Sequence, residues 1–368
     1  MKVCLRLFTC FACLMAAFAA RAATPAALLY FPPAAEAWEL VAPAAVGWDS
    51  DRLNAALELA GKNHASGVLI LHRGKILAER YWSLEEKAGT AGNGRTYHEL
   101  LRGHDEAGHV IEDVASVQKS VASLLVGIAR HQGPLQLDDP VSKHLGAGWS
   151  KASPEQEGAI TLQHLVTMTS GLKDDLTFEA PAGTRWRYNS AAYAQTMRVV
   201  ATVAKKSPND LTRAWLTGRI GMSNTSWMER TLPGEVAVNP LGLATTARDL
   251  ARFGLLVLAD GRWKDQTVIE DRDYLHAALR PSQKLNPSYG YLWWLNGQSE
   301  VARGAGQRAK GPLIPSAPPD LVAALGAVDR KLYVVPSLGL VVTRLGFNTA
   351  PTFQDEFWRL LMAAALRQ

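Results

Sequence analysis

The stretch Ser116-Val117-Gln118-Lys119 begins a segment whose apolar residues recur at helical spacing to about Ala129, shortly before Gly133. A serine and a lysine three residues apart lie one turn apart on the same face of a helix, so the amine can reach the hydroxyl. A serine hydroxyl needs a neighbouring base to act as a nucleophile. Lysine can be that base only if burial or nearby positive charge lowers its pKa from about 10.4. The helix N-terminus adds a positive field that suits an anionic intermediate.

A second stretch, Ser170-Gly171-Leu172-Lys173, has the same spacing. The pattern alone therefore does not identify a nucleophile. Glycine directly after the serine opposes a helix at this point, and no apolar helical repeat follows. Ser116 stands where an amphipathic helix begins, so we prefer it as the candidate nucleophile.

Composition places the chain among ordinary globular proteins, with 48% hydrophobic and 20% charged residues in a length of 368. Such a length allows one large domain or two intermixed ones. The formal net charge is +5, but without Lys2, Arg6 and Arg21 there remain 36 basic residues against 34 acidic ones. This balance gives no reason to expect nucleic acid or an anionic membrane surface as a partner.

The first 22 residues have the features of a signal peptide. Lys2 and Arg6 precede an apolar run over 7–20, and Ala20-Arg21-Ala22 fits a signal-peptidase site. The run is short for a bilayer span, although an uncleaved anchor is the alternative. We expect a periplasmic or secreted chain with no stable membrane span after cleavage. All three cysteines lie in this leader, so the mature chain would have no disulfide, thiolate zinc site or cysteine nucleophile.

The remaining chain divides into an Ala- and Pro-rich arm over 23–46 and a domain over 47–368. Strands are expected over 68–71, 75–81, 321–325, 331–335 and 340–345. Helices are expected from about 50, 116, 162, 190, 246 and 352, with Ser50, Thr246 and Thr352 as caps. Residues 83–109 read as a polar loop whose three histidines are solvated rather than metal-bound.

These elements predict an α+β fold. Two strands near the start and three near the end would form one antiparallel five-stranded sheet, flanked by helices and built from about 66–82 and 289–346. A mostly helical subdomain over about 116–260 would lie beside it. We expect the start of the Ser116 helix in a cleft between the two.

Several short sequences, taken in order, carry a family resemblance. They are residues 114–120, 137–141 (Leu-Asp-Asp-Pro-Val), 160–165 (Ile-Thr-Leu-Gln-His-Leu), 169–172 (Thr-Ser-Gly-Leu), 181–183 with Tyr188, 246–253 and 289–291. With them the chain resembles the serine β-lactamase and penicillin-binding-protein superfamily from about Gly47 to the C-terminus. It is most similar to the class C β-lactamase-related group, which includes esterases, D-amino-acid peptidases and nylon-oligomer hydrolases.

The resemblance implies three functional motifs. The first is Ser116 with Lys119. The second is Tyr188-Asn189-Ser190, in which Tyr188 would shuttle protons between Ser116, the leaving group and the deacylating water. A tyrosine normally titrates near 10 and needs a cation such as Lys119 nearby to act as a base. No metal or organic cofactor is implied.

The third motif would be Ala324-Leu325-Gly326 on a strand lining the cleft. The N–H of Ala327, next to Gly326, would then join the N–H of Ser116 as an oxyanion hole. Trp186, Tyr291, Trp293 and Trp294 are candidates for an apolar substrate pocket. Because adjacent strand residues face opposite ways, only one of Trp293 and Trp294 can line it.

Two departures from the family pattern bear on the substrate. Ser190 occupies the position of an asparagine, with Asn189 one place early. Ala324 replaces a lysine or histidine that usually binds a substrate carboxylate, and Arg330 and Lys331, which could compensate for it, lie beyond the next turn.

We therefore expect a serine hydrolase that cleaves a small ester, amide or peptide-like substrate. The alternatives are a penicillin-recognising sensor and a true β-lactamase on the same fold. The oligomeric state is left open.

Overall fold

The computed structural model describes residues 29–34, 37–84, 96–133, 135–231, 238–303 and 307–365. The predicted signal peptide lies outside this part of the chain. Within the described residues, no helix is both long enough and apolar enough to cross a bilayer.

The main sheet of the described chain has six antiparallel strands in the order β2-β1-β14-β13-β12-β9. They are β1 (Ala65–His72), β2 (Lys75–Tyr81), β9 (Trp294–Leu295), β12 (Val322–Leu325), β13 (Lys331–Val335) and β14 (Leu340–Gly346). The prediction of five strands is therefore one short. The missing strand, β9, has two residues paired with β12, too few to produce an alternating pattern. As predicted, strands from both ends of the chain are neighbours, with Val68 of β1 opposite Arg344 of β14.

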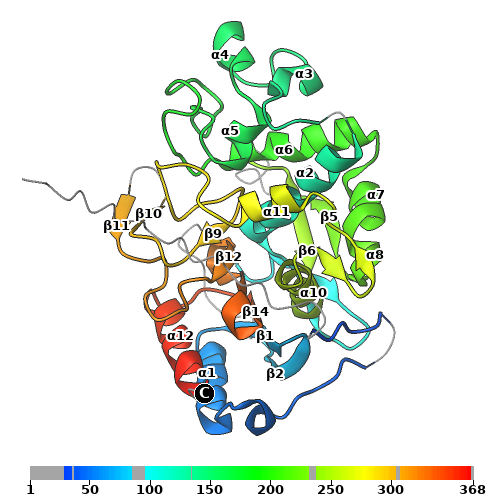
Figure 1. Cartoon of the computed structure of the whole chain (residues 1–368), viewed down its shortest axis with the longest axis vertical. Coiled ribbons are helices and arrows are strands. Elements are labelled where there is room, and N and C mark those ends of the chain that lie inside the picture. Colours follow the sequence, from blue (N-terminus) through cyan, green and yellow to red (C-terminus); the bar gives the residue numbers. More distant parts are fainter. Residues whose placement is uncertain are drawn as a thin grey trace, which may run out of the picture.

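Apolar side chains alternate between the two faces of the strands, so each face of the sheet has its own hydrophobic core. In β1, Val68 and Ile70 pack with α1 (Ser50–Lys62) and α12 (Phe353–Ala364), whereas Leu69 and Leu71 belong to the core containing α10 (Ala247–Leu258). Figure 1 shows α1 and α12 together on one side of the sheet.

The helix caps agree only partly with the sequence. Thr246 caps α10 as predicted, because its hydroxyl accepts a hydrogen bond from Asp249 N–H at 3.1 Å. Asp49, rather than Ser50, caps α1 by accepting from Asp51 and Arg52 N–H. Thr352 precedes α12 but makes no side-chain cap bond, since its backbone is already helical (φ −85°, ψ −10°).

A smaller antiparallel sheet in the order β3-β4-β6-β5 leads into the helical region. Its strands are β3 (Leu101–His104), β4 (Val110–Asp113), β5 (Ser226–Glu229) and β6 (Leu241–Thr245). The predicted loop over 83–109 is thus wrong for β3, an edge strand whose polar side chains obscure the strand pattern. His109 at the end of this hairpin bonds Asp105 and stacks on Tyr81.

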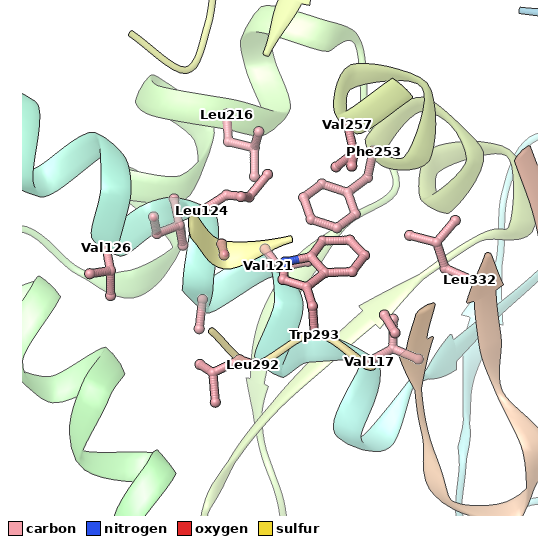
Figure 2. Close-up of a cluster of buried hydrophobic side chains, with 14 of the residues drawn as sticks. Val117, Val121, Leu124, Val126, Leu216, Phe253, Val257, Leu292, Trp293 and Leu332 are labelled. Atoms are coloured by element: carbon pink, nitrogen blue, oxygen red, sulfur yellow. The ribbon is translucent and has the colours of Figure 1, made fainter. Parts of the chain in front are cut away.

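Helix α2 (Gln118–Gln132) forms the centre of the helical region. Every residue from Gln118 to Ala129 is buried. Figure 2 shows Val117 and Val121 among the side chains of Phe253 and Trp293. The surrounding helices are α3 (Val141–Leu145), α4 (Pro154–Gly158), α5 (Leu162–Val166), α6 (Ser190–Ala204), α7 (Pro208–Thr212), α8 (Gly218–Ile220) and α11 (Arg272–Ala278). Two further hairpins pair β7 (Arg262–Trp263) with β8 (Gln266–Thr267) and β10 (Glu300–Arg303) with β11 (Gln307–Lys310).

Candidate active site

Ser116 lies in a short 3-10 turn, η3 (Ala115–Val117), directly before α2. The residue before it, Ala115, has a positive φ of 48°, a conformation that a residue with a side chain seldom adopts. The Asp113 carboxylate stabilises this turn by accepting the Ala115 N–H at 2.9 Å. Ser116 is half-buried and directly precedes the N-terminus of a buried helix.

Lys119 lies one helical turn beyond Ser116, with its side chain beside the hydroxyl. Its Nζ is 2.9 Å from Ser116 Oγ and 3.0 Å from Ser190 Oγ. Burial, and secondarily the positive charge of Arg230, lowers the Lys119 pKa to about 7, while Asp113 opposes this change. A substantial fraction of the amine is therefore neutral near pH 7 and able to accept a proton from serine.

Arg230 and Asp113 form a buried ion pair under this turn. Arg230 Nε and Nη2 donate to the two Asp113 carboxylate oxygens at 2.8 and 2.9 Å, and Nη2 also donates to Gln118 Oε1 at 3.1 Å. The sequence did not predict this pair. No local pattern could have found it, because 117 positions separate the two residues.

Tyr188 comes to the same site from the segment before α6. The Lys119 Nζ lies 4.9 Å from the centre of its ring. Burial raises the Tyr188 pKa to about 12, although a hydrogen bond with Ser116 opposes part of the rise. Tyr188 is therefore protonated near neutral pH, and the residue suited to act as base in the free protein is Lys119.

The two residues that follow Tyr188 in the second motif have different roles. Asn189 is buried: its Oδ1 caps α6 by accepting Ala192 N–H, and its Nδ2 donates to the carbonyls of Leu172 and Lys173. Ser190 is the residue that faces Lys119. Ser190, rather than Asn189, therefore lies beside the reactive pair.

Tryptophan side chains surround Tyr188. Trp186 packs at 6.4 Å from the Tyr188 ring, and Trp294 stacks on it at 5.8 Å. Trp186 is buried by Tyr289 and Trp294, so its ring supports Tyr188. Trp293 instead stacks on Phe253 in the core (Figure 2). Of the adjacent pair, Trp294 is the one that reaches the site.

The end of β12 passes against the backbone that leads into Ser116. A Cβ on Gly326 would lie 2.4 Å from the Val114 carbonyl oxygen, so only glycine fits this approach. Ala327 follows as the first residue of η5 (Ala327–Asp329). Ala324 is 1% exposed and packed in the core. Arg330 is one of the two cations considered as its replacement. It is fully buried, with its Nη2 3.0 Å from Glu112 Oε2.

A cavity of about 380 Å³ opens beside Tyr188. Its lining residues are Tyr188, Trp294, Arg303, Leu313, Leu325, Asp329, Lys331, Thr349, Ala350, Pro351 and Gln354. Lys331, the other cation considered above, therefore faces a space adjoining the site.

Comparison with known proteins bears on the family and the fold. Residues 53–366 match the family described as Beta-lactamase. An uncharacterised protein of Alkalihalophilus pseudofirmus is 25% identical over 311 residues, covering 77% of this chain and 84% of that protein. A putative β-lactamase structure from Bacteroides dorei has a TM-score of 0.64 at 15% identity, covering 87% of this chain and 100% of that one.

A putative 6-aminohexanoate-dimer hydrolase from Bacillus anthracis has a TM-score of 0.63 at 16% identity, covering 92% of this chain and 89% of that one. At such identities the structural likeness establishes the fold, whereas the family match covers most of the chain. The chain belongs to the Beta-lactamase family, within the superfamily of serine β-lactamases and penicillin-binding proteins.

Proposed function

We propose that this protein hydrolyses an ester or amide bond through an acyl-enzyme on Ser116. The observation that carries the proposal is the 2.9 Å separation between Lys119 Nζ and Ser116 Oγ, with Lys119 buried. A buried amine with a pKa near 7 can take the serine proton as the oxygen attacks the substrate carbonyl.

Tyr188 is the proposed proton donor to the leaving group. Its high pKa keeps the phenol protonated, and the stacked Trp294 ring holds it in place. The bond to the leaving alcohol or amine then breaks as that group takes a proton. The proton on Lys119 can replace the one that Tyr188 gives up. The proposed donors to the oxyanion are the N–H groups of Ser116 and Ala327.

Water completes the cycle by attacking the acyl-enzyme carbonyl. Its proton passes to the Lys119–Tyr188 pair, the bond to Ser116 Oγ breaks, and a carboxylic acid leaves with the serine hydroxyl restored. All groups that the cycle needs are side chains and backbone of this chain, together with water.

The proposed substrate is an open-chain ester or amide rather than a β-lactam. The support is Ala324, which is apolar and buried where related enzymes carry a cation for a carboxylate. A penicillin carboxylate would therefore meet no cation at position 324. The predicted signal peptide further supports action in the periplasm or outside the cell, which fractionation of the native producer would test.

Intact-protein mass spectrometry tests the proposal. The mature chain is mixed with p-nitrophenyl butyrate or with penicillin G, and released product is followed in parallel. We expect turnover or an adduct with the ester, absent in Ser116→Ala, and weak reaction with penicillin. A persistent penicilloyl adduct would instead indicate a penicillin sensor, and rapid penicillin turnover would indicate a β-lactamase.

A further inference from the structure

The cavity beside Tyr188 has a distinctive charge. It contains two cations, Arg303 and Lys331, and one carboxylate, Asp329. Both oxygens of that carboxylate are already engaged: Oδ1 lies 3.0 Å from Lys331 Nζ, and Oδ2 accepts from the backbone N–H and the hydroxyl of Thr349. The cavity therefore holds two cations against one carboxylate, and that carboxylate is paired with Lys331 itself and with Thr349.

The polar groups still available to a ligand are donors. Arg303 is exposed and uses Nη2 for one hydrogen bond, 3.0 Å long, to the Leu313 carbonyl. Gln354 Nε2 is buried and has no hydrogen-bond partner in the described part of the chain. Since a buried donor without an acceptor is costly, this amide nitrogen indicates that an acceptor belongs nearby.

The sheet register explains how Lys331 reaches this place. In the antiparallel pair of β12 and β13, Leu325 lies opposite Lys331, so the two side chains share a face. Ala324 points to the other face, into the core that contains α10. Lys331 of β13 therefore lies beside the end of β12. Its side chain is on the face of the sheet opposite to that of Ala324.

We infer that the cavity binds a carboxylate of the substrate through Lys331 and Arg303, so that the protein prefers open-chain esters or amides bearing an anionic group away from the bond that is cleaved. This inference rests on the proposed function and adds the class of substrate. Trp294, Leu313 and Leu325 give the same cavity apolar walls for the hydrocarbon part of such a substrate.

Matched ester pairs test the inference. One pair places the charge on the acyl side, p-nitrophenyl butyrate against mono-p-nitrophenyl glutarate. The other places it on the leaving group, phenyl acetate against 4-acetoxybenzoate. We measure kcat/KM for each ester, normalised to its uncatalysed hydrolysis. In at least one pair the carboxylated ester should be preferred about tenfold or more. Lys331→Met should lower that preference by about tenfold to a hundredfold, as expected for a charge-assisted hydrogen bond.

Companion variants separate recognition from folding. Arg303→Gln should lower the preference by a smaller factor, because this side chain is exposed. Lys331→Arg should retain much of it. Lys310→Met removes an exposed cation of the β10–β11 hairpin outside the cavity and should leave it unchanged. If Lys331→Met does not fold, Arg303→Gln carries the test.

The outcomes distinguish the two proposals. Ester turnover with no preference for the carboxylate in either pair, or a preference that survives both Lys331→Met and Arg303→Gln, overturns the inference and leaves the proposed function standing. Absence of both turnover and a Ser116 adduct with all four esters overturns the proposed function and, with it, the inference.

Discussion

The chain contains two Ser-x-x-Lys sequences, and they fold in different ways. At Ser116 the pattern begins a buried helix, so Lys119 Nζ returns to within 2.9 Å of the serine oxygen. At Ser170 the next residue, Gly171, has a φ of 73° and turns the chain away from a helix. Lys173 is consequently exposed, and Ser170 Oγ accepts a bond from Leu172 N–H at 3.3 Å. A serine and a lysine three residues apart therefore come into contact only when the backbone between them is helical.

Asn189 and Ser190 connect the two regions. Asn189 holds the carbonyls of Leu172 and Lys173, whereas the next residue, Ser190, contacts Lys119. The turn at the second sequence therefore supports the start of α6, which in turn presents a hydroxyl to the first. One copy provides the candidate chemistry and the other helps to position it.

The largest expected difference is between the two serines. Ser116→Ala should remove the acyl adduct and lower turnover by about 10⁴- to 10⁶-fold, because no other nucleophile is proposed. Ser170→Ala should keep most of the turnover. Burst kinetics with p-nitrophenyl butyrate measure both. Full activity in Ser116→Ala would contradict the assignment of the nucleophile.

The two lysines should differ next. Lys119→Met removes the proposed base and should lower kcat/KM by about 10²- to 10⁴-fold. Lys173→Met changes an exposed side chain and should have little effect. The comparison uses steady-state kinetics, with circular dichroism to show that both variants are folded. Equal losses in the two variants would mean that Lys119 has no special role.

The pH profile should report the environment of Lys119. Because the neutral amine is the base, kcat/KM should rise as the pH passes about 7, where Lys119 loses its proton. Arg230→Gln should move this midpoint to higher pH, since it removes a charge that lowers the Lys119 pKa and uncovers Asp113, which raises it. At pH values below the midpoint, kcat/KM should fall about tenfold for each whole pH that the midpoint rises, because the neutral fraction of the amine falls by that factor.

Arg213→Gln is the matched control for that profile, because Arg213 is an exposed arginine paired with Asp210. Its midpoint should equal that of the unmodified protein. A midpoint that stays near 7 in Arg230→Gln would show that another group titrates in the profile.

Asn189 and Ser190 should separate stability from rate. Asn189→Ala loses a helix cap and two hydrogen bonds to backbone carbonyls, and should lower the free energy of unfolding by about 1–3 kcal/mol. Ser190→Ala should leave Tm nearly unchanged and lower kcat/KM about tenfold, the value of one lost hydrogen bond. Calorimetry measures Tm and steady-state kinetics measures kcat/KM. A lower Tm in Ser190→Ala with an unchanged Tm in Asn189→Ala would contradict these roles.

At the turn itself, the expected effect is on stability alone. Gly171→Ala places a side chain at positive φ, with its Cβ 2.0 Å from the Ala180 carbonyl oxygen, and should lower stability by about 1–3 kcal/mol. Gly158→Ala, where the added carbon meets nothing within 4 Å, is the control. Equal Tm values for the two variants would show that the turn adapts without strain.

Much of the fold could be predicted from local patterns. Strands β1, β2, β13 and β14 follow from runs of apolar and β-branched residues, and α2 and α10 follow from helical periodicity and, for α10, a capping threonine. The strands of the smaller sheet, β9 and the two short hairpins were missed. Of these, β3 is a polar edge strand and β7, β8 and β9 have two residues each, so none of the four produces a periodic signal.

The sequence by itself determined that Ser116 and Lys119 can meet, because both lie within one helical turn and the helix is locally encoded. Only the tertiary structure decided what surrounds them. It brings Arg230 from a distant segment to pair with Asp113, sets Ser190 rather than Asn189 beside Lys119, and turns Lys331 into the cavity by the register of β12 and β13. These contacts depend on long-range packing and on strand register, and no local sequence pattern specifies either. A register shift of one residue, for example, would move the Lys331 side chain to the other face of the sheet.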